Sequence, residues 1–419
     1  VLAPLENGTV ITNEAVFDDG FNDEIHRFTQ TAIESPPTII LSTSPVDGDE
    51  DVSITPSIRT VFNQIMDKAS VEGAFSISRA DGVEPEEPED WLEGWTYRKK
   101  ITVDHNKVNG DQDSFPVLID VTNDSWKSMA YGGHVAQSNG GDIAFTMTDG
   151  LTKLNHEIEG YFPSSGKLTA WVRTDLSATE NTEIYIYYGN EGGGLNEENP
   201  TGVWDNNYQM VQHMADSSTS TIADSTSNNN DGRKKAANDP VEAPGKIGAA
   251  QSFDRSAHID CGTSDSLKPS NITIEGWVNA RTMNNWMGII SNMQTWGSGF
   301  SEQIGSTQNF ATMISGTYLR TSTTPAVDTW YHVVSTHDGI TNLNTLYVNG
   351  VRANSSTRAV VYNPNNPTYI GAFYTSGSLS LDGLIDEARI SSTVRSAGWI
   401  NTQYLNQNDP ASFVMLDNE

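Results

Sequence analysis

The feature that most constrains this chain is a series of short runs, between residues 245 and 390, in which apolar and polar residues alternate. In the run ITIEGWVNA, the side chains of Ile272, Ile274 and Val278 fall on one side of an extended chain, opposite Thr273 and Glu275. A period of two residues is typical of a β-strand with one buried face. Turns rich in Gly, Asp and Asn close the runs, as in DTWYHVVSTHDG and LNTLYVNGVRA. The pattern predicts antiparallel strands joined by tight turns.

The same alternation extends over residues 91–195, in runs such as SFPVLIDVT and NTEIYIYYGN. A chain of 419 residues is long enough for two to four domains. We therefore predict an all-β protein built of tandem antiparallel β-sandwiches. One helix is expected near the end of the chain, where Trp399, Ile400 and Tyr404 give a short amphipathic cover for the last sandwich.

Three segments resemble known families. The runs ITIEGWVNA, DTWYHVVSTHDG, LNTLYVNGVRA and LDGLIDEARI make residues 196–419 similar to the laminin-G-like, concanavalin-A-like jelly roll. The series W-x-Y-R-K-x-I, D-I-x-F, L-x-x-E-I-E, A-W-V and I-Y-x-Y-Y-G-N makes residues 91–195 similar to the domain of unknown function 2341 of prokaryotic surface proteins. The phrase SPVDGDEDV and the turn at Phe62, Met66 and Asp67 make residues 36–90 resemble a bacterial immunoglobulin-like module. These resemblances imply an extracellular surface protein whose jelly roll holds ligands or partners.

The immunoglobulin-like segment is incomplete, because it stops near Ser78 and passes into the acidic linker DGVEPEEPED. Half a sandwich leaves an open face and unpaired strand edges. Residues 1–35 form a polar arm with sparse apolar positions and no closed unit of their own. The missing strands are expected from this arm, from the next domain or from a neighbouring copy of the chain.

The charge of the chain excludes some partners. The net charge is −30, from 54 acidic and 24 basic residues, so the chain cannot neutralise the phosphates of a nucleic acid. It does suit divalent cations or a saline setting. No run of 18 apolar residues occurs, and we therefore expect no membrane span. Cys261 is the single cysteine, which excludes an intramolecular disulfide and predicts a buried structural thiol.

A calcium site is implied by the resemblance to laminin-G-like domains. There, an Asx-rich loop commonly sits beside the aspartate of a late strand written I-D-E-x-R-I. The corresponding residues here are Asp224, Asn228, Asp231 and Asp386. Calcium prefers six to eight oxygen ligands of this kind. The alternative is a metal-free, hydrogen-bonded turn, with Asp386 in a strand-edge salt bridge to Arg389.

A second set of residues could recognise a sugar by stacking an aromatic face on its C–H surface. The aromatic residues in and beside the loops of the jelly roll are Trp286, Trp296, Phe310, Tyr318 and Tyr374. The alternative is that these side chains close the ends of the sandwich or pack against the neighbouring domain, as buried aromatics commonly do.

A catalytic pair of carboxylates is not predicted. Glu157 and Glu159 share one face of a strand, roughly 6.5–7 Å apart by the strand rise, and read as two surface carboxylates. Asp386 and Glu387 are adjacent in a strand and are expected on opposite faces. His332 is expected to be a structural hydrogen-bonding residue. We therefore predict that the chain is not an enzyme.

Two functions remain open at this stage. The jelly roll could bind a glycan or a protein on a surface, with calcium in place, as an adhesin does. Alternatively, the chain could be the repeating subunit of a filament or sheath, in which the arm of one copy adds a strand to the next. The two are compatible, and an accessory module of a polysaccharide-active enzyme is the remaining alternative.

Overall fold

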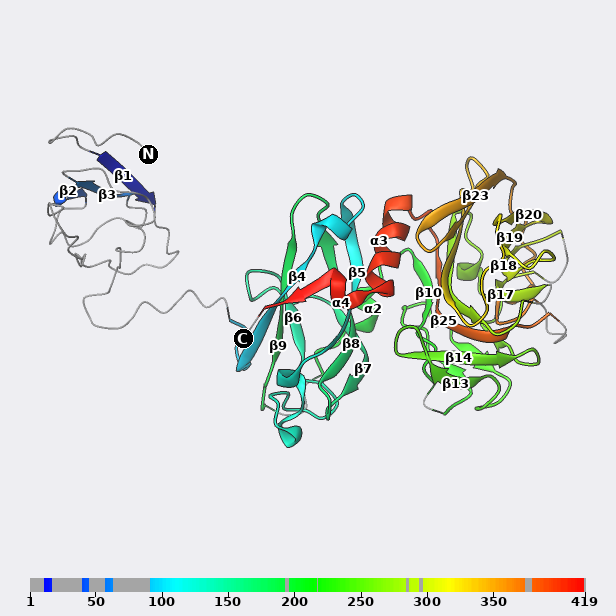
Figure 1. The fold of residues 1–419 in the computed structure, drawn as a ribbon, viewed down its shortest axis with the longest axis horizontal. Coiled ribbons are helices and arrows are strands. Elements are labelled where there is room, and N and C mark those ends of the chain that lie inside the picture. Colours follow the sequence, from blue (N-terminus) through cyan, green and yellow to red (C-terminus); the bar gives the residue numbers. More distant parts are fainter. Residues whose placement is uncertain are drawn as a thin grey trace. The chain divides into compact units, whose positions relative to one another are not determined.

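The computed structural model describes residues 91–192, 196–216, 218–283, 286–293, 297–373 and 379–417, together with three strands before residue 91. The chain divides into two compact units, residues 1–90 and residues 91–419. Figure 1 shows that the second unit is built almost wholly of strands. The predicted all-β class, with antiparallel sandwiches and a final jelly roll, is confirmed.

The first unit contains one three-stranded antiparallel sheet in the order β1-β3-β2. Its strands are β1 (Ile11–Val16), β2 (Ile40–Ser44) and β3 (Ser57–Phe62). The register of β1 on β3 runs from Ile11 opposite Phe62 to Val16 opposite Ser57. A segment of the predicted arm therefore pairs with the immunoglobulin-like segment of the same chain. Met66, Asp67 and the acidic linker lie outside the described residues.

The second unit begins with a β-sandwich of two sheets. One sheet has the order β26-β4-β9-β6 and the other has the order β5-β8-β7. The strands are β4 (Tyr97–Val103), β5 (Gln112–Thr122), β6 (Ala144–Thr146), β7 (His156–Phe162), β8 (Lys167–Leu176), β9 (Thr182–Tyr188) and β26 (Val414–Leu416). Short helical turns lie at η1 (His105–Lys107), η2 (Asp124–Trp126), η3 (Met129–Tyr131) and α2 (Pro200–Val203).

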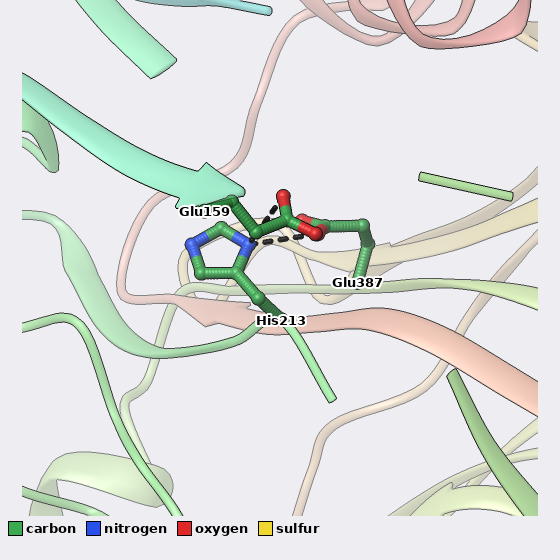
Figure 2. Close-up of side chains that lie close together, drawn as sticks. All are labelled: Glu159, His213 and Glu387. Atoms are coloured by element: carbon green, nitrogen blue, oxygen red, sulfur yellow. Dashed lines mark hydrogen bonds and ion pairs between the residues drawn. The ribbon is translucent and has the colours of Figure 1, made fainter. Parts of the chain in front are cut away.

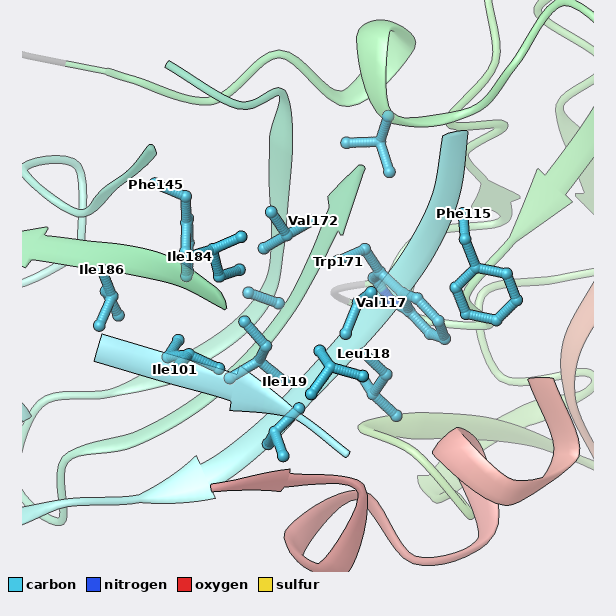
Figure 3. Packing of buried hydrophobic residues seen from close by; sticks show 14 of the residues in the cluster. Ile101, Phe115, Val117, Leu118, Ile119, Phe145, Trp171, Val172, Ile184 and Ile186 are labelled. Carbon is cyan, nitrogen blue, oxygen red and sulfur yellow. The ribbon is translucent and has the colours of Figure 1, made fainter. Parts of the chain in front are cut away.

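The core of this sandwich confirms the alternation read from the sequence. Figure 3 shows Ile101 of β4 and Ile184 of β9 packed with Ile119 of β5 and Val172 of β8. All four side chains are almost completely buried. Each deeply buried aliphatic side chain contributes about 1.5–3 kcal/mol to folding, so these interlocking layers dominate the stability of the sandwich.

His156 is an uncharged histidine buried in the same sandwich. Its ring lies edge-on to Phe145, with ring centroids 5.1 Å apart, and both ring nitrogens are buried without a hydrogen-bond partner. Burial lowers the pKa of His156 to about 4, while the charges of Glu197 and Lys153 act on it in opposite directions. The unfolded chain takes up a proton near pH 6.5, and the folded chain does so only near pH 4. The contribution of His156 to stability is therefore lost as the pH falls through this window.

We expect His156→Leu to remove that acid sensitivity. Between pH 7 and pH 4 the wild-type free energy of unfolding should fall by about 3 kcal/mol more than that of the variant, at 1.36 kcal/mol per pKa unit. Urea unfolding of both proteins at both pH values measures this difference, and titrations shared by the two proteins cancel. Equal pH dependence in the two proteins would show that His156 can be charged in the folded state.

The jelly roll follows, with two eight-stranded sheets. The front sheet has the order β13-β14-β25-β16-β21-β22-β23, and β10 pairs with β25; the back sheet has the order β11-β12-β15-β24-β17-β18-β19-β20. The front strands are β10 (Tyr208–Gln212), β13 (Val241–Pro244), β14 (Ala249–Asp254), β16 (Ile272–Ala280), β21 (Trp330–His337), β22 (Leu343–Val348), β23 (Val351–Thr357) and β25 (Asp382–Ser391). The back strands are β11 (Thr221–Ile222), β12 (Gly232–Lys234), β15 (Ile259–Asp260), β17 (Met287–Ser291), β18 (Phe300–Ile304), β19 (Phe310–Ile314), β20 (Thr317–Arg320) and β24 (Tyr369–Ile370), with the turn η4 (Asp265–Leu267) nearby.

Strand β16 shows both the success and the limit of the sequence pattern. Ile272, Ile274 and Val278 enter the core between the two sheets, as the alternation predicts. The opposite face of β16 is also buried, because Glu275 is 3% exposed and Trp277 is 1% exposed. Cys261 is buried without a disulfide, which confirms the predicted structural thiol.

The helix predicted near the end of the chain is α3 (Ala397–Asn408), and the short α4 (Pro410–Phe413) follows it. The buried face of α3 is rich in amides. Asn406 accepts a hydrogen bond from the backbone N–H of Leu118 in β5 (2.7 Å) and donates one to the Leu118 carbonyl (3.0 Å). Gln407 accepts from the Trp277 indole at 2.6 Å, and Gln403 donates to Glu275 at 2.9 Å. The helix thus joins the free edge of the β5-β8-β7 sheet to the outer face of β16 in the jelly roll.

Strand β26, after α4, pairs antiparallel with β4, with Val414 opposite Val103. The C-terminal part of the chain therefore returns to the first sandwich and adds a strand to it (Figure 1). The first sandwich and the jelly roll are consequently linked by the bridge that starts at α2 and by the segment from α3 to β26.

Candidate functional site

A bulge in β25 creates a cluster of charged side chains. Glu275 of β16 lies opposite Arg389 and Trp277 lies opposite Asp386, so the register shifts by one residue between them. Glu387, which has a φ of 52°, belongs to the bulged segment of β25, and the side chain of the next residue, Ala388, packs in the core. Such a bulge re-aims side chains. The prediction that Asp386 and Glu387 point to opposite faces is wrong, because the bulge turns both toward the first sandwich.

His213, just after β10, stands at the centre of this cluster. Figure 2 shows the carboxyl groups of Glu387 and Glu159 together on one side of its ring. The Nδ1 atom of His213 lies 2.7 Å from Glu387 Oε1 and 3.6 Å from Glu159 Oε2. The Nε2 atom lies 3.3 Å from Glu157 Oε2. Glu157 and Glu159 come from β7, the edge strand of the β5-β8-β7 sheet, so the cluster lies between the sandwich and the jelly roll.

The interpretation of Glu157 and Glu159 as surface carboxylates is therefore wrong. Their side chains are 12% and 3% exposed, because the outer face of the β5-β8-β7 sheet packs against the jelly roll. Glu157 accepts hydrogen bonds from the Trp204 indole (2.8 Å) and the Ser225 hydroxyl (2.5 Å). Glu159 accepts one from the Trp171 indole at 2.9 Å.

Arg389 supplies the permanent positive charge of the cluster. Its guanidinium pairs with Glu387 and lies 3.8 Å from Glu275. It also stacks on Trp171 and Trp204, 4.4 and 4.7 Å from their ring centroids. The two indole faces stabilise the cation, although its Nε and Nη1 atoms are buried without a hydrogen-bond partner.

Carboxyl groups outnumber cationic groups in this buried space. The pKa values of some carboxyl groups are therefore raised and those of others are lowered. Burial raises the pKa of Glu159 to about 8 and raises that of Asp386 well above its usual range, and repulsion by Glu387 adds to both effects. Burial also opposes ionisation of Glu387, but the charges of His213 and Arg389 outweigh it and lower the pKa of Glu387. The cluster therefore separates into ionised and neutral acids, as expected for close carboxylates.

The predicted calcium loop is held by hydrogen bonds within the protein. The carboxylate of Asp224 accepts from the backbone N–H groups of Val211, Thr226 and Asn230 and from the Thr226 hydroxyl, at 2.8–3.0 Å. Asp231 accepts from the backbone N–H of Asp224 at 2.9 Å. This is the geometry of a hydrogen-bonded Asx turn, in which donors occupy the oxygens that a cation would use.

The structure does not bring Asp386 to that loop. Asp386 accepts from the backbone N–H of Ile247 at 2.8 Å, and Asn228 donates to the Tyr208 carbonyl at 3.2 Å. Among the described residues, the acidic and imidazole ligand atoms that gather within 4.8 Å of one another are those of Glu159, His213 and Glu387. Asp386 also makes no salt bridge to Arg389, which pairs with Glu387 instead. Calcium binding at the loop stays a prediction.

The structure also separates the aromatic residues that were predicted to recognise a sugar. Trp286 and Tyr318 lie together, with ring centroids 5.4 Å apart, and the Arg320 guanidinium lies 4.7 Å from the Tyr318 ring. Phe310 is 2% exposed and packs in the core against Tyr331, so it offers no face to a ligand. Trp296 and Tyr374 lie outside the described residues.

A polar cleft of about 740 Å³ opens beside β12 and β15, and nothing in the sequence analysis predicted it. Arg233 of β12 lies directly opposite Asp260 of β15 in the strand register, and Asp231 is two residues before Arg233. The lining residues are mostly hydroxyls, amides and charged groups: Ser220, Thr221, Asn229, Asn230, Asp231, Arg233, Lys234, Asp260, Cys261, Gly262, Thr263 and Ser264.

Sequence reasoning did not single out His213, and it considered Glu387 and Arg389 only as strand neighbours of Asp386. One signal was available, since D-E-A-R lies inside the otherwise apolar strand LDGLIDEARI. Charged residues in such a run are rarely buried unless they are paired. Arg233 and Asp260 carried no local signal, because strand pairing alone makes them neighbours.

Family models match three parts of the chain. The model described as the concanavalin A-like lectin/glucanases superfamily matches residues 253–401. The domain of unknown function 2341 matches residues 139–226, and a bacterial Ig-like domain matches residues 33–114. No curated protein matches the chain. None of the helices in the described residues is long and apolar enough to cross a membrane.

Solved structures with similar folds include domain 4 of AbnA, an extracellular arabinanase from Geobacillus stearothermophilus, in complex with arabinotriose. It is 18% identical, with a TM-score of 0.39, over 47% of this chain and 97% of that one. The binding domain of Paraclostridial Mosquitocidal Protein 1 is 17% identical, with a TM-score of 0.38, over 47% of this chain and 52% of that one.

A third is the native heptameric SAP-like pentraxin from Limulus polyphemus, 14% identical, with a TM-score of 0.27, over 32% of this chain and 69% of that one. The matches to the family models confirm the three resemblances read from the sequence. Parts of the chain are thus similar to a bacterial Ig-like domain, to the domain of unknown function 2341 and to the concanavalin A-like lectin/glucanases superfamily.

Proposed function

We propose that the chain is a non-enzymatic, extracellular surface protein whose laminin-G-like domain binds a glycan in the polar cleft beside β12 and β15. The observation that carries this proposal is that Arg233 and Asp260, directly opposite each other in the register of β12 and β15, both line that cleft. An arginine fork and a carboxylate side by side offer donors and acceptors to the vicinal hydroxyls of a sugar. The volume of about 740 Å³ lies in the usual range of ligand sites.

The burial of the charged cluster supports a binding role over catalysis. The side chains of His213, Glu159 and Glu387 are 8%, 3% and 1% exposed. A substrate could not come within hydrogen-bond reach of these groups, as general acid–base catalysis requires. The accessible chemistry of the jelly roll lies at the cleft and at Trp286 and Tyr318.

The cleft proposal predicts that Arg233→Ala weakens glycan binding at least tenfold, which corresponds to about 1.4 kcal/mol for a charge-assisted contact. The full-length chain would be screened on a glycan array, and hits would be titrated by calorimetry. Arg352→Ala on β23 is the matched control, since Arg352 is an exposed strand arginine of the other sheet. The titration is repeated with Ca²⁺ and with EDTA, because Asp231 belongs both to the cleft and to the predicted calcium loop.

Two outcomes would contradict glycan binding in the cleft. Binding that survives Arg233→Ala but fails in Trp286→Ala would place the glycan on the aromatic pair Trp286–Tyr318. Binding that survives both substitutions, or no glycan binding by the wild-type chain, would leave a protein partner as the ligand of this surface.

Self-assembly is the second candidate function; β1 pairs with β3 within one chain, and assembly would exchange this strand between copies. A strand that pairs with an open sheet inside one chain can pair with the same sheet of the next copy. We expect deletion of residues 1–35 to leave a folded monomer and to abolish large assemblies of the chain. Light scattering and negative-stain imaging measure this. Deletion of residues 1–9 keeps β1 and is the control; the same oligomers from both deletions would exclude the arm as the connector.

A further inference from the structure

We propose that Glu159, His213 and Glu387 hold one divalent transition-metal ion, of the Zn²⁺ class, between the first sandwich and the jelly roll. The three side chains come from β7, from the segment after β10 and from the bulge of β25. An ion held by all three would join segments far apart in the sequence and would stabilise the interface between the two domains.

The ligand atoms already converge. His213 Nδ1 lies 2.7 Å from Glu387 Oε1 and 3.6 Å from Glu159 Oε2, and the three ligand atoms fall within 4.8 Å of one another (Figure 2). Around a tetrahedral Zn²⁺ with ligands at 2.0–2.2 Å, neighbouring ligand atoms are separated by about 3.4 Å. The observed separations bracket this value, so small side-chain rotations suffice to close the site.

The surroundings of the three ligands orient them as metal sites require. The Nε2 atom of His213 faces Glu157, which is fixed by the Trp204 indole and the Ser225 hydroxyl. A histidine that donates Nε2–H to a carboxylate presents its Nδ1 lone pair to a metal. Glu159 is held by the Trp171 indole, and Glu387 is held by Arg389.

Two buried carboxylate oxygens at the cluster have no hydrogen-bond partner. They are Glu159 Oε1 and Asp386 Oδ1, and Asp386 lies near enough to Glu159 and Glu387 to interact with both electrostatically. Buried acceptors are normally paired, and a cation would satisfy these. Glycines let these carboxylates approach the backbone: a Cβ atom on Gly248 would lie 2.0 Å from Glu159 Oε1, and one on Gly245 would lie 2.6 Å from Asp386 Oδ2.

The charges and donor types favour a transition metal. The pKa shifts leave Glu159 and Asp386 neutral in the metal-free cluster, opposite the charges of Arg389 and His213, and a dication would take the place of the protons on Glu159 and on His213 Nδ1. Calcium prefers six to eight oxygen ligands, whereas a mixed imidazole and carboxylate set suits Zn²⁺. Three protein ligands leave one position of a tetrahedral Zn²⁺ to a fourth donor, and the burial of all three ligands suits a structural role.

The test uses Zn²⁺ and the full-length chain, expressed in minimal medium with and without ZnCl₂. Inductively coupled plasma mass spectrometry should find one zinc per chain after gel filtration in the supplemented protein. With zinc at about a hundred times its dissociation constant, the melting temperature should rise by roughly 5–10 °C. Glu159→Gln and His213→Gln should lose both the zinc and the shift.

Glu302→Gln is the matched control, because Glu302 of β18 is also fully buried but is not one of the converging ligands. It should bind zinc as the wild type does. Expression with Co²⁺ gives a readout that needs no variant: visible d–d bands should appear in the wild-type chain. The proposal would be overturned if the wild-type chain contained no bound zinc and showed no cobalt d–d bands. Full zinc occupancy in folded His213→Gln would overturn it as well.

Discussion

Replacing Arg389 with methionine should lower the free energy of unfolding by about 3–5 kcal/mol, the usual cost of removing one partner from a buried ion pair. The Arg389 side chain is 1% exposed and pairs with Glu387, whose side chain is equally buried. Methionine keeps an apolar body between Trp171 and Trp204 but leaves the carboxylates of Glu387 and Glu275 without their common cation. Urea unfolding followed by tryptophan fluorescence measures the loss.

Two further variants make this result interpretable. Arg352→Met on the exposed strand β23 is the control and should change stability by no more than about 0.5 kcal/mol. The double variant Arg389→Met with Glu387→Gln should recover part of the loss, because it removes one of the uncompensated charges. A loss below about 1 kcal/mol for Arg389→Met alone would mean that water or another cation already neutralises the cluster.

Asn406→Leu should cost about 2–6 kcal/mol, since it leaves two buried backbone groups of Leu118 unpaired at about 1–3 kcal/mol each. Asn406 now satisfies both the N–H and the carbonyl of Leu118 from α3, and all three groups are buried. Leucine has a similar size, so packing changes little and the hydrogen bonds dominate the effect. Calorimetric unfolding and urea titration both report it.

The control for this variant is Asn408→Leu, at the exposed end of the same helix. It tests whether an added leucine on α3 perturbs the chain for other reasons, and it should be within about 0.5 kcal/mol of the wild type. Similar losses in the two variants would show that the link between α3 and β5 does not depend on the Asn406 amide.

Both predictions concern one structural principle of this protein. The outer faces of two sheets, which would be polar if exposed, pack against each other through charged side chains and amides rather than through aliphatic ones. Buried polar groups of this kind stabilise an interface only when nearly all are paired. Loss of a single partner is therefore expected to cost more here than loss of one methyl group from either core.

Much of the fold could be predicted from local patterns. The alternation of Ile272, Ile274 and Val278 identified β16 and its core-facing side, and the residues around Trp399 identified α3. These predictions succeed because side-chain periodicity depends only on backbone geometry. The position of Cys261 in an apolar setting was recognisable for the same reason.

The candidate sites were less predictable. Trp286 and Tyr318 do lie together, but Phe310 belongs to the core, because the alternation of β19 places its side chain between the sheets. Arg233 and Asp260 are separated by 27 positions in the chain, from 233 to 260, and meet only through the pairing of β12 with β15. A linear reading has no means of assigning that register.

The amino-acid sequence by itself determined that this protein is all-β, where its laminin-G-like strands run and which of their faces enter the core. Only the tertiary structure decided the environment of Glu157, Glu159, His213 and Arg389. The same E-x-E pattern suits a solvated strand or a buried interface, and the difference lies in whether another sheet covers it. The bulge at Glu387 and the packing of two sheets face to face turn scattered charges into one buried cluster, because burial and charge pairing are properties of neighbours in space.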